Sequence, residues 1–383
     1  MKIIRGGIVY QGDEWKNDID ILLEEGKILD IVPKGKYNEG QAIDADGYFV
    51  CPGFIDIHIH GCAGRDVMDG SVDALEDIAR FIAGHGTTSF LATTAASSRE
   101  ATRASLKAVA AIMKKQCRGA QILGVHLEGP FINPEAKGAL AGQHILPASI
   151  NGFTDLAGEY EGIIKRVTLA PDVEGARELT GYLVNKGVVV SMGHTAAGYD
   201  ECIEGIEWGM RHATHFYNAM TPLKHREPGA VGAFMAREDT TIELIADLVH
   251  VHPAALKIAV GVKGCSRVAL ITDSMAATGM DDGEYFLGLQ EVVVNQGVAR
   301  LKDSGNLAGS TLTLDKALRN MVSIGFQVND VVKMLTEVPA CITGVDDHKG
   351  RIEKGYDADL VILDKNLYVN MVFIKGNWYG INI

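Results

Sequence analysis

Short apolar runs alternate with amphipathic segments along the chain between about residues 50 and 275. Runs such as VVVSMG and RVALIT are continuously apolar, as in strands buried on both faces of a parallel sheet. The segments between them are helical in pattern: Val72, Leu75 and Ile78 begin one apolar stripe, and Ser97 with Glu100 predicts a capping box at the start of the next helix. The alternation predicts an α/β fold with a parallel sheet.

Eight strand-like runs can be counted in this region, each followed by a polar or glycine-containing loop. They lie at residues 50–60, 87–95, 122–130, 163–173, 188–194, 212–218, 241–251 and 267–274. Eight strands alternating with helices over roughly 250 residues are typical of a (β/α)8 TIM barrel, which is the fold we expect. After the eighth strand, GLQEVVVNQGVARL with its Asn295-Gln296-Gly297 turn predicts a β-hairpin insertion at about residues 281–305.

The two ends of the chain alternate as strands do and lack helical periodicity. Two apolar runs around Glu25-Gly26 predict a hairpin, and three strand-like runs end the chain, the last of them NWYGI at residues 377–381. Neither end has enough residues for a stable sheet of its own. We therefore predict a small β-sandwich domain built from residues 1–50 and 346–383, beside a catalytic barrel domain at residues 51–345.

Composition narrows the class of protein. The chain has 383 residues, of which 47% are hydrophobic, and its 36 Lys and Arg against 49 Asp and Glu give a net charge of −13. It has none of the basic blocks that nucleic acids and anionic membranes attract. It also lacks the ~20 uninterrupted apolar residues of a membrane span and an apolar leader segment. We expect a cytoplasmic protein with neither a nucleic-acid partner nor a membrane partner.

Metal-binding side chains stand at the ends of five of the expected strands, where TIM barrels place their active sites. The first strand ends in His58-Ile59-His60, and strand alternation puts both imidazoles on one face. The other four strand ends carry His126 with Glu128, His194, His215 and Asp273. Imidazole and carboxylate groups bind Zn, Fe, Mn or Co in hydrolases and leave one position open for water. The set therefore predicts a divalent metal site.

Asp273 suits a second role. A water molecule that attacks an amide must lose a proton, and the departing nitrogen must gain one. A carboxylate at a strand end that faces the metal can carry out both transfers. The alternatives are that Asp273 is itself a metal ligand or that it is a buried hydrogen-bonding residue.

The motifs around these residues are similar to those of a known family. VCPGFIDIHIHG at residues 50–61 and GRIEKGYDADLVILD at residues 350–364 resemble the amidohydrolase superfamily. Within it, the order of HLEGPFINPEAKGA, SMGHT, ATHFYNAMTPLKHREPG, IADLVHVHP, LITDSMAATG and LAGSTLTLD resembles the N-acetylglucosamine-6-phosphate deacetylases. The resemblance spans nearly the whole chain. It implies metal-dependent hydrolysis of N-acetyl-D-glucosamine 6-phosphate to D-glucosamine 6-phosphate and acetate, in amino-sugar catabolism and cell-wall sugar recycling.

Carried over by position, the resemblance implies a role for each strand-end residue. The main metal would be held by Glu128, His194 and His215, and Asp273 would be the catalytic acid and base. His58 and His60 match a pair that holds a second metal in some members only. We therefore expect one or two divalent metals per chain.

The resemblance also implies how the sugar phosphate is bound. The matching positions are Ala139, Asn218, Ala219, Arg226, His250, Leu307 and Ala308. His250 would also act in catalysis by polarising the acetyl carbonyl. Arg226 has the planar fork of donors that suits a phosphate, and it could act in its own subunit or in the neighbouring subunit of a homodimer. Leu140 is a departure, because many members have a polar side chain there, which leaves that sugar contact open.

Two other functions fit part of the pattern. A cyclic-amide amidohydrolase similar to dihydroorotase or hydantoinase would carry a carboxylated lysine at the end of the fourth strand. That strand ends here in Leu169-Ala170-Pro171-Asp172, and Lys165 lies too early. A non-catalytic barrel that serves as a scaffold would usually have lost ligands or the base, which this chain retains. Measurement of the metal content would separate a scaffold from an enzyme.

Overall fold

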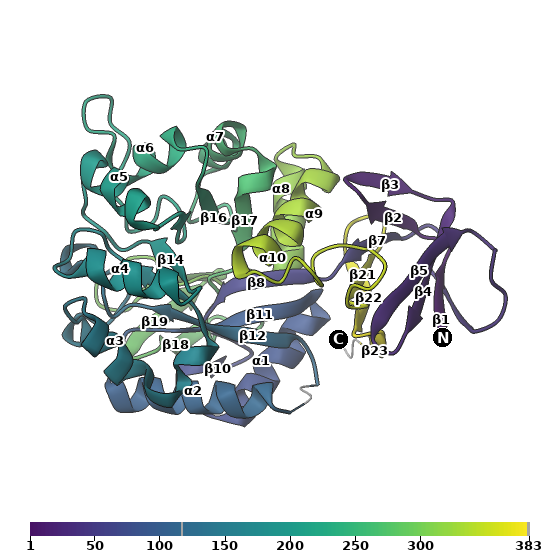
Figure 1. Cartoon of the computed structure of the whole chain (residues 1–383), viewed down its shortest axis with the longest axis horizontal. Coiled ribbons are helices and arrows are strands. Elements are labelled where there is room, and N and C mark those ends of the chain that lie inside the picture. Colours follow the sequence, from purple (N-terminus) through teal and green to yellow (C-terminus); the bar gives the residue numbers. More distant parts are fainter. Residues whose placement is uncertain (116–117, 381–383) are drawn as a thin grey trace.

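The computed structural model describes residues 1–115 and 118–380. An eight-stranded sheet surrounded by helices forms the larger part, and the two chain ends form sheets beside it (Figure 1). The N-terminal strands, purple in Figure 1, lie next to the C-terminal strands, yellow, on the same side of the barrel. The ends of the chain therefore come together, as the sequence predicts.

The barrel strands follow one another in chain order, each parallel to the next. They are β8 (Phe54–Ile59), β11 (Thr87–Thr94), β12 (Gln121–Glu128), β13 (Ile164–Leu169), β14 (Val189–Met192), β15 (His212–Ala213), β16 (Thr241–Ile245) and β17 (Val268–Ile271). Beyond the ends of β17 and β8, the Asp273 N–H donates to the His58 carbonyl and the His60 N–H donates to the Ser274 carbonyl, both at 2.9 Å. These bonds bring the last strand to the first, and the predicted eight-stranded barrel is confirmed.

Helices cover the outside of the barrel (Figure 1). They are α1 (Val72–Gly84), α2 (Arg99–Met113), α3 (Ile150–Ala157), α4 (Ala176–Asn185), α5 (Tyr199–Trp208), α6 (Gly229–Ala236), α7 (Pro253–Lys263), α8 (Leu314–Ser323), α9 (Val328–Leu335) and α10 (Glu337–Thr343). The predicted stripe of α1 is buried at Leu75 and Ile78. The predicted cap of α2 was wrong by one residue: the hydroxyl of Ser98, not of Ser97, accepts the Ala101 N–H at 3.2 Å.

Short 3₁₀ turns and one small hairpin connect these elements. The turns are η1 (Val67–Asp69), η2 (Pro134–Ala136), η3 (Gly142–His144), η4 (Gly158–Ile163) and η5 (Cys265–Arg267), and the hairpin strands are β9 (Gly61–Cys62) and β10 (Arg65–Asp66).

The predicted strand at residues 50–60 is two strands. β7 (Phe49–Pro52) pairs with strands of the chain ends, whereas β8 belongs to the barrel. Gly53 separates them, and a Cβ atom at this position would lie 2.0 Å from Oγ1 of Thr88. The chain can therefore pass this closely to β11 only at a glycine.

The chain ends form two sheets. One has the order β5 (Lys27–Pro33), β4 (Ile19–Glu24), β1 (Lys2–Arg5) and β6 (Gln41–Asp44). The other has the order β23 (Asn377–Tyr379), β22 (Val369–Ile374), β21 (Leu360–Leu363), β7, β2 (Ile8–Gln11) and β3 (Glu14–Lys16). Glu25 and Gly26 form the predicted turn with φ of 48° and 81°. Ile381 of the predicted last strand lies outside the described residues, and the domain division at residues 50 and 345 stays a prediction.

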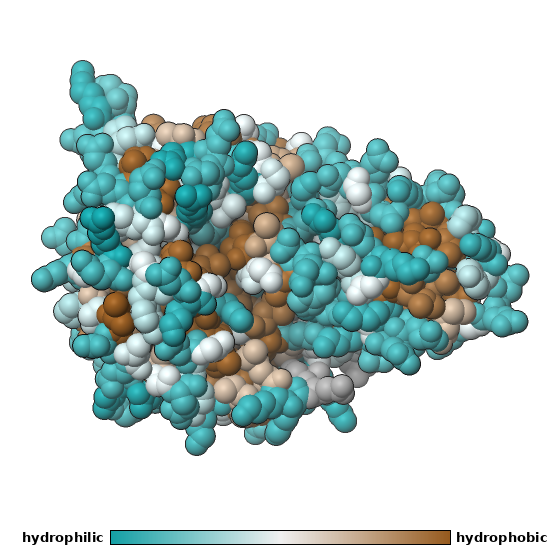
Figure 2. All heavy atoms as spheres, viewed as in Figure 1, coloured by the Kyte–Doolittle hydropathy of each residue, from teal (hydrophilic) through white to brown (hydrophobic). Residues whose placement is uncertain are grey.

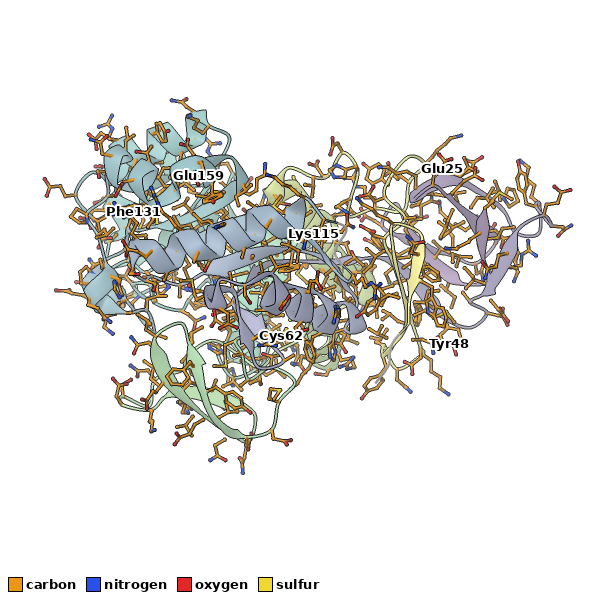
Figure 3. All side chains as sticks on the ribbon, turned by 90° about the horizontal axis from the view of Figure 1, so that it is seen from below. Glu25, Tyr48, Cys62, Lys115, Phe131 and Glu159 are labelled. Carbon is orange, nitrogen blue, oxygen red and sulfur yellow. The ribbon has the colours of Figure 1, made fainter. Side chains whose placement is uncertain are left out.

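The predicted insertion is a three-stranded antiparallel sheet of β18 (Gly283–Leu287), β19 (Gln290–Asn295) and β20 (Val298–Leu301). It contains the expected hairpin, with Gln296 and Gly297 in the left-handed region at φ of 52° and 72°, and one strand more. In Figure 3 these green strands project from the barrel. Leu287 and Val292 pack with Ala308, so the insertion covers one side of the strand ends.

The surface is mainly hydrophilic on the face shown in Figure 2. Hydrophobic residues show near the middle of this face and over the terminal strands. None of the helices within residues 1–115 and 118–380 has the length and apolar character needed to cross a membrane.

Candidate metal centre and substrate pocket

Glu128, His194 and His215 converge above the ends of β12, β14 and β15. Nε2 of His194 lies 3.3 Å and Nε2 of His215 lies 3.2 Å from Oε1 of Glu128. The two Nε2 atoms are 2.9 Å apart, and all three residues are buried. Ligand atoms around a tetrahedral metal with bonds of about 2.0 Å lie about 3.3 Å from one another. The three side chains thus have the spacing of a metal site.

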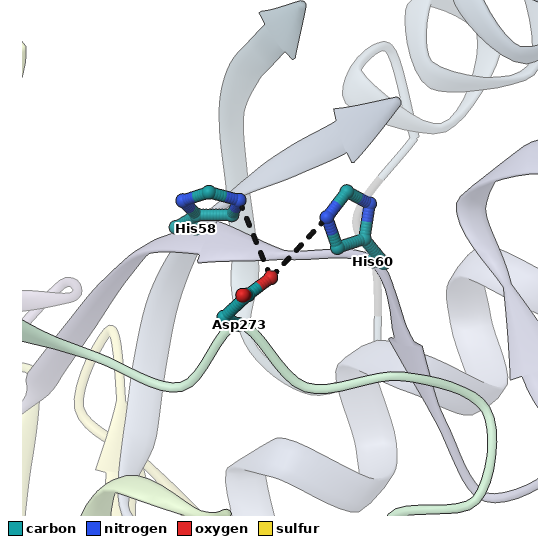
Figure 4. Close-up of side chains that lie close together, drawn as sticks. All are labelled: His58, His60 and Asp273. Carbon is teal, nitrogen blue, oxygen red and sulfur yellow. Dashed lines mark ion pairs between the residues drawn. The ribbon is translucent and has the colours of Figure 1, made fainter. Parts of the chain in front are cut away.

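A second group consists of His58, His60 and Asp273 (Figure 4). Oδ1 of Asp273 lies 3.4 Å from Nε2 of His58 and 3.3 Å from Nε2 of His60. Glu128 stands between the two groups, because its Oε1 is 3.3 Å from His58 and its Oε2 is 3.2 Å from His60. One carboxylate could therefore serve both groups.

The donor atoms fit a divalent cation. Nδ1 of His194 lies 2.9 Å from the Ala136 carbonyl and Nδ1 of His58 lies 3.2 Å from Oε2 of Glu243, so both Nδ1 atoms face acceptors. Hydrogens on Nδ1 leave the Nε2 lone pairs directed at the centre. Among the described residues, Nε2 of His58 is a buried polar atom with no hydrogen-bond partner, as expected of a metal ligand.

The charges of the two groups depend on each other. Burial lowers the pKa of the His58 imidazole, but the carboxylates of Glu128 and Asp273 outweigh burial and raise it to about 9. Burial raises the pKa of Glu128, yet the neighbouring imidazoles, His58 above all, hold it well below its usual value. In the absence of a cation, protons on imidazoles balance these carboxylates. A divalent cation would supply the same positive charge.

Three of the predicted side chains stand on left-handed backbone. His194, His215 and Asp273 have φ of 49°, 29° and 49°, and each lies just beyond the last residue of a barrel strand. Such a conformation costs a non-glycine residue about 1–3 kcal/mol. Hydrogen bonds hold it, since the His215 N–H donates to Oε2 of Glu243 at 3.0 Å. Strain at these strand ends is the usual mark of a functional site.

A pocket joins the ligand groups to most of the predicted substrate positions. It is lined by His60, Glu128, Gly138, Ala139, Leu140, His194, His215, Asn218, Ala219, His250, Asp273, Leu287, Leu307 and Gly309. Ala308 does not line the pocket but is buried beside it with Leu287. Arg226 is exposed on the loop between β15 and α6, outside the pocket. In the part of the chain that the structure describes, no Lys or Arg lines this pocket.

His250 has a partner that sequence reasoning missed. Its Nδ1 lies 2.7 Å from Oδ2 of Asp247, and its backbone N–H donates to Oδ1 of the same carboxylate at 2.8 Å. Burial lowers the pKa of His250, but Asp247 outweighs burial and raises it. Asp247 thereby fixes the imidazole with Nε2 free for the pocket. The signal was an aspartate and a histidine three residues apart after an apolar strand.

One predicted strand-end residue, His126, lies away from the ligand groups, and two charged residues inside the barrel were not predicted. His126 belongs to neither ligand group, because its Nε2 lies 2.8 Å from Oγ1 of Thr168 inside the barrel. Arg166 and Glu243, which the sequence analysis did not select, form a buried ion pair under the ligands. Glu243 is the single charge of β16 and could have been identified by it, whereas Arg166 stands next to Lys165 on β13 and is less conspicuous. Lys165 is exposed, which removes it from the site.

Leu140 forms an apolar part of the pocket. It is only 4% exposed and packs with Ala95, Ala96 and Ile132. A sugar hydroxyl at this wall would find no side-chain partner, which agrees with the departure noted in the sequence.

The sequence of residues 49–379 matches the amidohydrolase family. The chain belongs to the amidohydrolase family. Within it, the chain is 38% identical to the N-acetylglucosamine-6-phosphate deacetylase of Bacillus subtilis (strain 168) over 377 residues, which cover 97% of this chain and 94% of the relative. It is 37% identical over 377 residues to the N-acetylgalactosamine-6-phosphate deacetylase of Escherichia coli O157:H7, and 98% of each chain is covered.

Solved structures resemble this amidohydrolase over nearly its full length. An N-acetylglucosamine-6-phosphate deacetylase from Pasteurella multocida superposes with a TM-score of 0.93 at 30% identity, covering 98% of this chain and 99% of that one. A mutant N-acetyl-D-glucosamine-6-phosphate deacetylase from Mycobacterium smegmatis, in complex with N-acetyl-D-glucosamine-6-phosphate, gives 0.93 at 30% identity and covers 99% of both chains. The resemblance that the motifs predicted is therefore confirmed at the level of the family.

Proposed function

We propose that this amidohydrolase releases acetate from N-acetyl-D-glucosamine 6-phosphate and leaves D-glucosamine 6-phosphate. The observation that carries the proposal is the common pocket of Asp273 with Glu128, His194 and His215. It places a carboxylate that can move protons beside three residues with the spacing of a metal site. The Bacillus subtilis relative, similar over 97% of this chain, supports the choice of substrate.

The reaction requires two proton transfers, one from the attacking water and one to the amide nitrogen of the leaving group. A divalent metal, when bound by Glu128, His194 and His215, would lower the pKa of a water molecule and polarise the acetyl carbonyl. Asp273 accepts the proton of the attacking water and then returns it to the amide nitrogen as acetate leaves. Burial raises the pKa of Asp273, but His58 and His60 outweigh burial and lower it, so the carboxylate is ionised and ready to accept. His250 donates to the developing oxyanion through Nε2.

The sugar phosphate is held by the other residues of the pocket. Asn218 and the backbone of Ala139, Ala219 and Leu307 contact the sugar. Ala308, the other predicted position, is buried beside the pocket without lining it. Arg226 supplies the positive charge for the phosphate, and its exposed loop supports delivery from the neighbouring subunit of a homodimer. That arrangement would explain why no Lys or Arg within residues 1–115 and 118–380 lines the pocket.

The number and kind of metal follow from the two groups. We propose that the Glu128 group binds one divalent metal and that the His58 group can bind a second one, with Zn, Fe, Mn and Co as the candidates. The oxygens of Glu128 face both groups, which supports two ions that share this carboxylate.

Two further proposals concern the rest of the chain. We propose that the two terminal sheets form a small β-sandwich domain, supported by a shared cluster of buried residues that includes Ile4, Ile21, Val9 and Leu360. We also propose a cytoplasmic location.

The two alternative functions are disfavoured. The exposure of Lys165 disfavours a cyclic-amide substrate, and the complete set of candidate ligands disfavours a scaffold role.

The deciding experiment is an acetate-release assay with metal analysis of the same sample. We expect turnover of N-acetyl-D-glucosamine 6-phosphate in proportion to bound metal, and much slower turnover of unphosphorylated N-acetylglucosamine. The 4-epimer, N-acetyl-D-galactosamine 6-phosphate, is the matched comparison because the Escherichia coli relative is named for it. Faster turnover of the 4-epimer would overturn the choice of sugar, and no turnover of either would overturn the deacetylase.

A further inference from the structure

Polar side chains fill the barrel interior just below the metal-binding groups, where TIM barrels usually pack Val, Ile and Leu. Arg166, on the inner face of β13, is fully buried. Its guanidinium donates to Oγ of Ser191 at 2.7 Å, to Oγ1 of Thr214 at 3.1 Å and to the Ile57 carbonyl at 3.1 Å. It also pairs with the carboxylate of Glu243. A single side chain thus joins β8, β13, β14, β16 and the end of β15.

Glu243, on β16, links this guanidinium to both ligand groups. Its Oε2 lies 3.2 Å from Nδ1 of His58 and accepts the backbone N–H of His215 at 3.0 Å. Its other oxygen faces Arg166 and lies 3.4 Å from Nε2 of His212. One carboxylate therefore touches the ring of a residue in one group and the strained backbone of a residue in the other.

A buried ion pair is weak evidence for a purely stabilising role. Taking two charges out of water is costly, and buried ion pairs are often no more stabilising than apolar residues of the same size. Most barrels fill this layer with apolar side chains. The contacts of Arg166 and Glu243 indicate instead that the pair orients residues of the two ligand groups, namely His58 and His215.

We propose that Glu243, anchored by Arg166, is a positioning residue of the metal centre. It fixes the hydrogen of His58 on Nδ1 and holds the backbone of His215, and it thereby sets the affinity of the His58, His60 and Asp273 group for a divalent metal. The inference rests on the proposed metal centre and extends it to residues that contact neither metal nor substrate.

Glu243→Gln keeps the shape of the side chain but replaces its charged carboxylate with a neutral amide. The guanidinium of Arg166 draws the amide oxygen towards itself, which turns the amide NH₂ towards Nδ1 of His58 and the N–H of His215. His58 then accepts at Nδ1 and carries its hydrogen on Nε2. In that tautomer Nε2 has no lone pair for a metal.

The tautomer can be read without a metal or a substrate. Because the pKa of metal-free His58 is raised to about 9, the spectra are recorded at about pH 10.5, where its imidazole is neutral. We expect ¹⁵N spectra of histidine-labelled, metal-free full-length protein to show His58 with hydrogen on Nδ1, assigned by loss of its signals in His58→Gln. In Glu243→Gln the hydrogen should move to Nε2. Competition with a chromophoric chelator should show that zinc binds about 10- to 100-fold more weakly to the variant. An unchanged tautomer together with zinc affinity within threefold of the wild type would overturn the proposal.

Asp359→Asn is the matched control. Asp359 is buried, pairs with Lys349 at 2.6 Å and accepts a hydrogen bond from Gln121 at the start of β12, whereas Glu128 stands at the other end of that strand. We expect this variant to lose thermal stability but to keep zinc affinity and the His58 tautomer. An equal loss of zinc affinity in both variants would mean that Glu243 only stabilises the fold.

Arg166→Lys is the second test variant, to be used if Glu243→Gln does not fold. It keeps the ion pair but removes the fork that reaches Ser191 and Thr214, so the carboxylate can turn away from His58. Zinc should bind roughly tenfold more weakly, and unchanged zinc affinity would overturn the proposal. Because neither readout uses turnover, a failure of the deacetylase assay would leave this test intact.

Discussion

Oδ1 of Asp273 lies 3.3 Å from Nε2 of His60, and both side chains line the pocket that contains Glu128. This position allows Asp273 two roles, because a carboxylate here can be a metal ligand or a catalytic acid and base. The Glu128 group has three candidate ligands, and Asp273 is not one of them. A substitution that removes the acid/base function can therefore be separated from the loss of the main metal.

Asp273→Asn should lose acetate release and keep the metal of the Glu128 group. The amide has nearly the shape of the carboxylate but cannot accept the proton of the attacking water, and general acid and base catalysis contributes about 10²- to 10⁴-fold. The measurements are the rate of acetate release and the metal content of the same preparation. Turnover near that of the wild type would contradict the acid/base role.

Removal of metal should destabilise the folded chain. A ligand that binds only the native state adds about 4 kcal/mol at a thousandfold excess over its Kd, so a strong chelator should lower the melting temperature by several degrees. Glu128→Gln should melt at nearly the same temperature with and without the chelator, because this substitution weakens both groups. If the chelator left the melting temperature of the wild type unchanged, that result would contradict the proposed metal centre.

Arg226→Ala should raise KM for the phosphorylated sugar. Loss of a charge-assisted hydrogen bond costs about 1.5–3 kcal/mol, which corresponds to roughly a 10- to 100-fold higher KM with a smaller change in kcat. Lys224→Ala is the control, because Lys224 is exposed on the same loop and pairs with Glu227 at 3.3 Å. If both substitutions had the same effect, general attraction by the loop rather than a specific contact would be responsible.

The barrel and the clustering of its candidate ligands could be predicted because their signals are local in the sequence. Strands buried on both faces read as continuous apolar runs, and the residues that end them, such as His194 and Asp273, gather at one end of a parallel barrel. The Gln296-Gly297 turn is equally local, because two left-handed residues suffice to form the hairpin.

Other features depend on contacts between distant segments. Gly53 is required by the approach of Thr88, which only the closed barrel brings about. Glu243 reaches His58 from a strand far away in the sequence, so spacing could not reveal that contact. The cap at Ser98 rather than Ser97 shows the ordinary uncertainty of a helix start, because either serine could have accepted the first free N–H groups.

Asp315 should make stability depend on pH in the acid range. It is buried at the start of α8, where Oδ1 lies 3.1 Å from Nδ1 of His85 and Oδ2 lies 2.9 Å from Nη1 of Arg319. Burial raises its pKa, but His85 and Arg319 outweigh burial and lower it to about 2. The unfolded chain, with an aspartate pKa of about 3.9, binds more protons between these values, so stability rises with pH there.

The contribution of Asp315 is fully present above about pH 4 and is lost as the pH falls through about 2. Its size is roughly 2–3 kcal/mol, from a pKa difference of nearly two at 1.36 kcal/mol each. Urea unfolding should therefore show Asp315→Asn less stable than the wild type by about 2–3 kcal/mol at pH 6, and by about half of that at pH 3. Asp347→Asn should change little at either pH, because Asp347 pairs with His348 in solvent. A deficit for Asp315→Asn that stays the same at both pH values would show that its hydrogen-bonding shape, and not its charge, stabilises the fold.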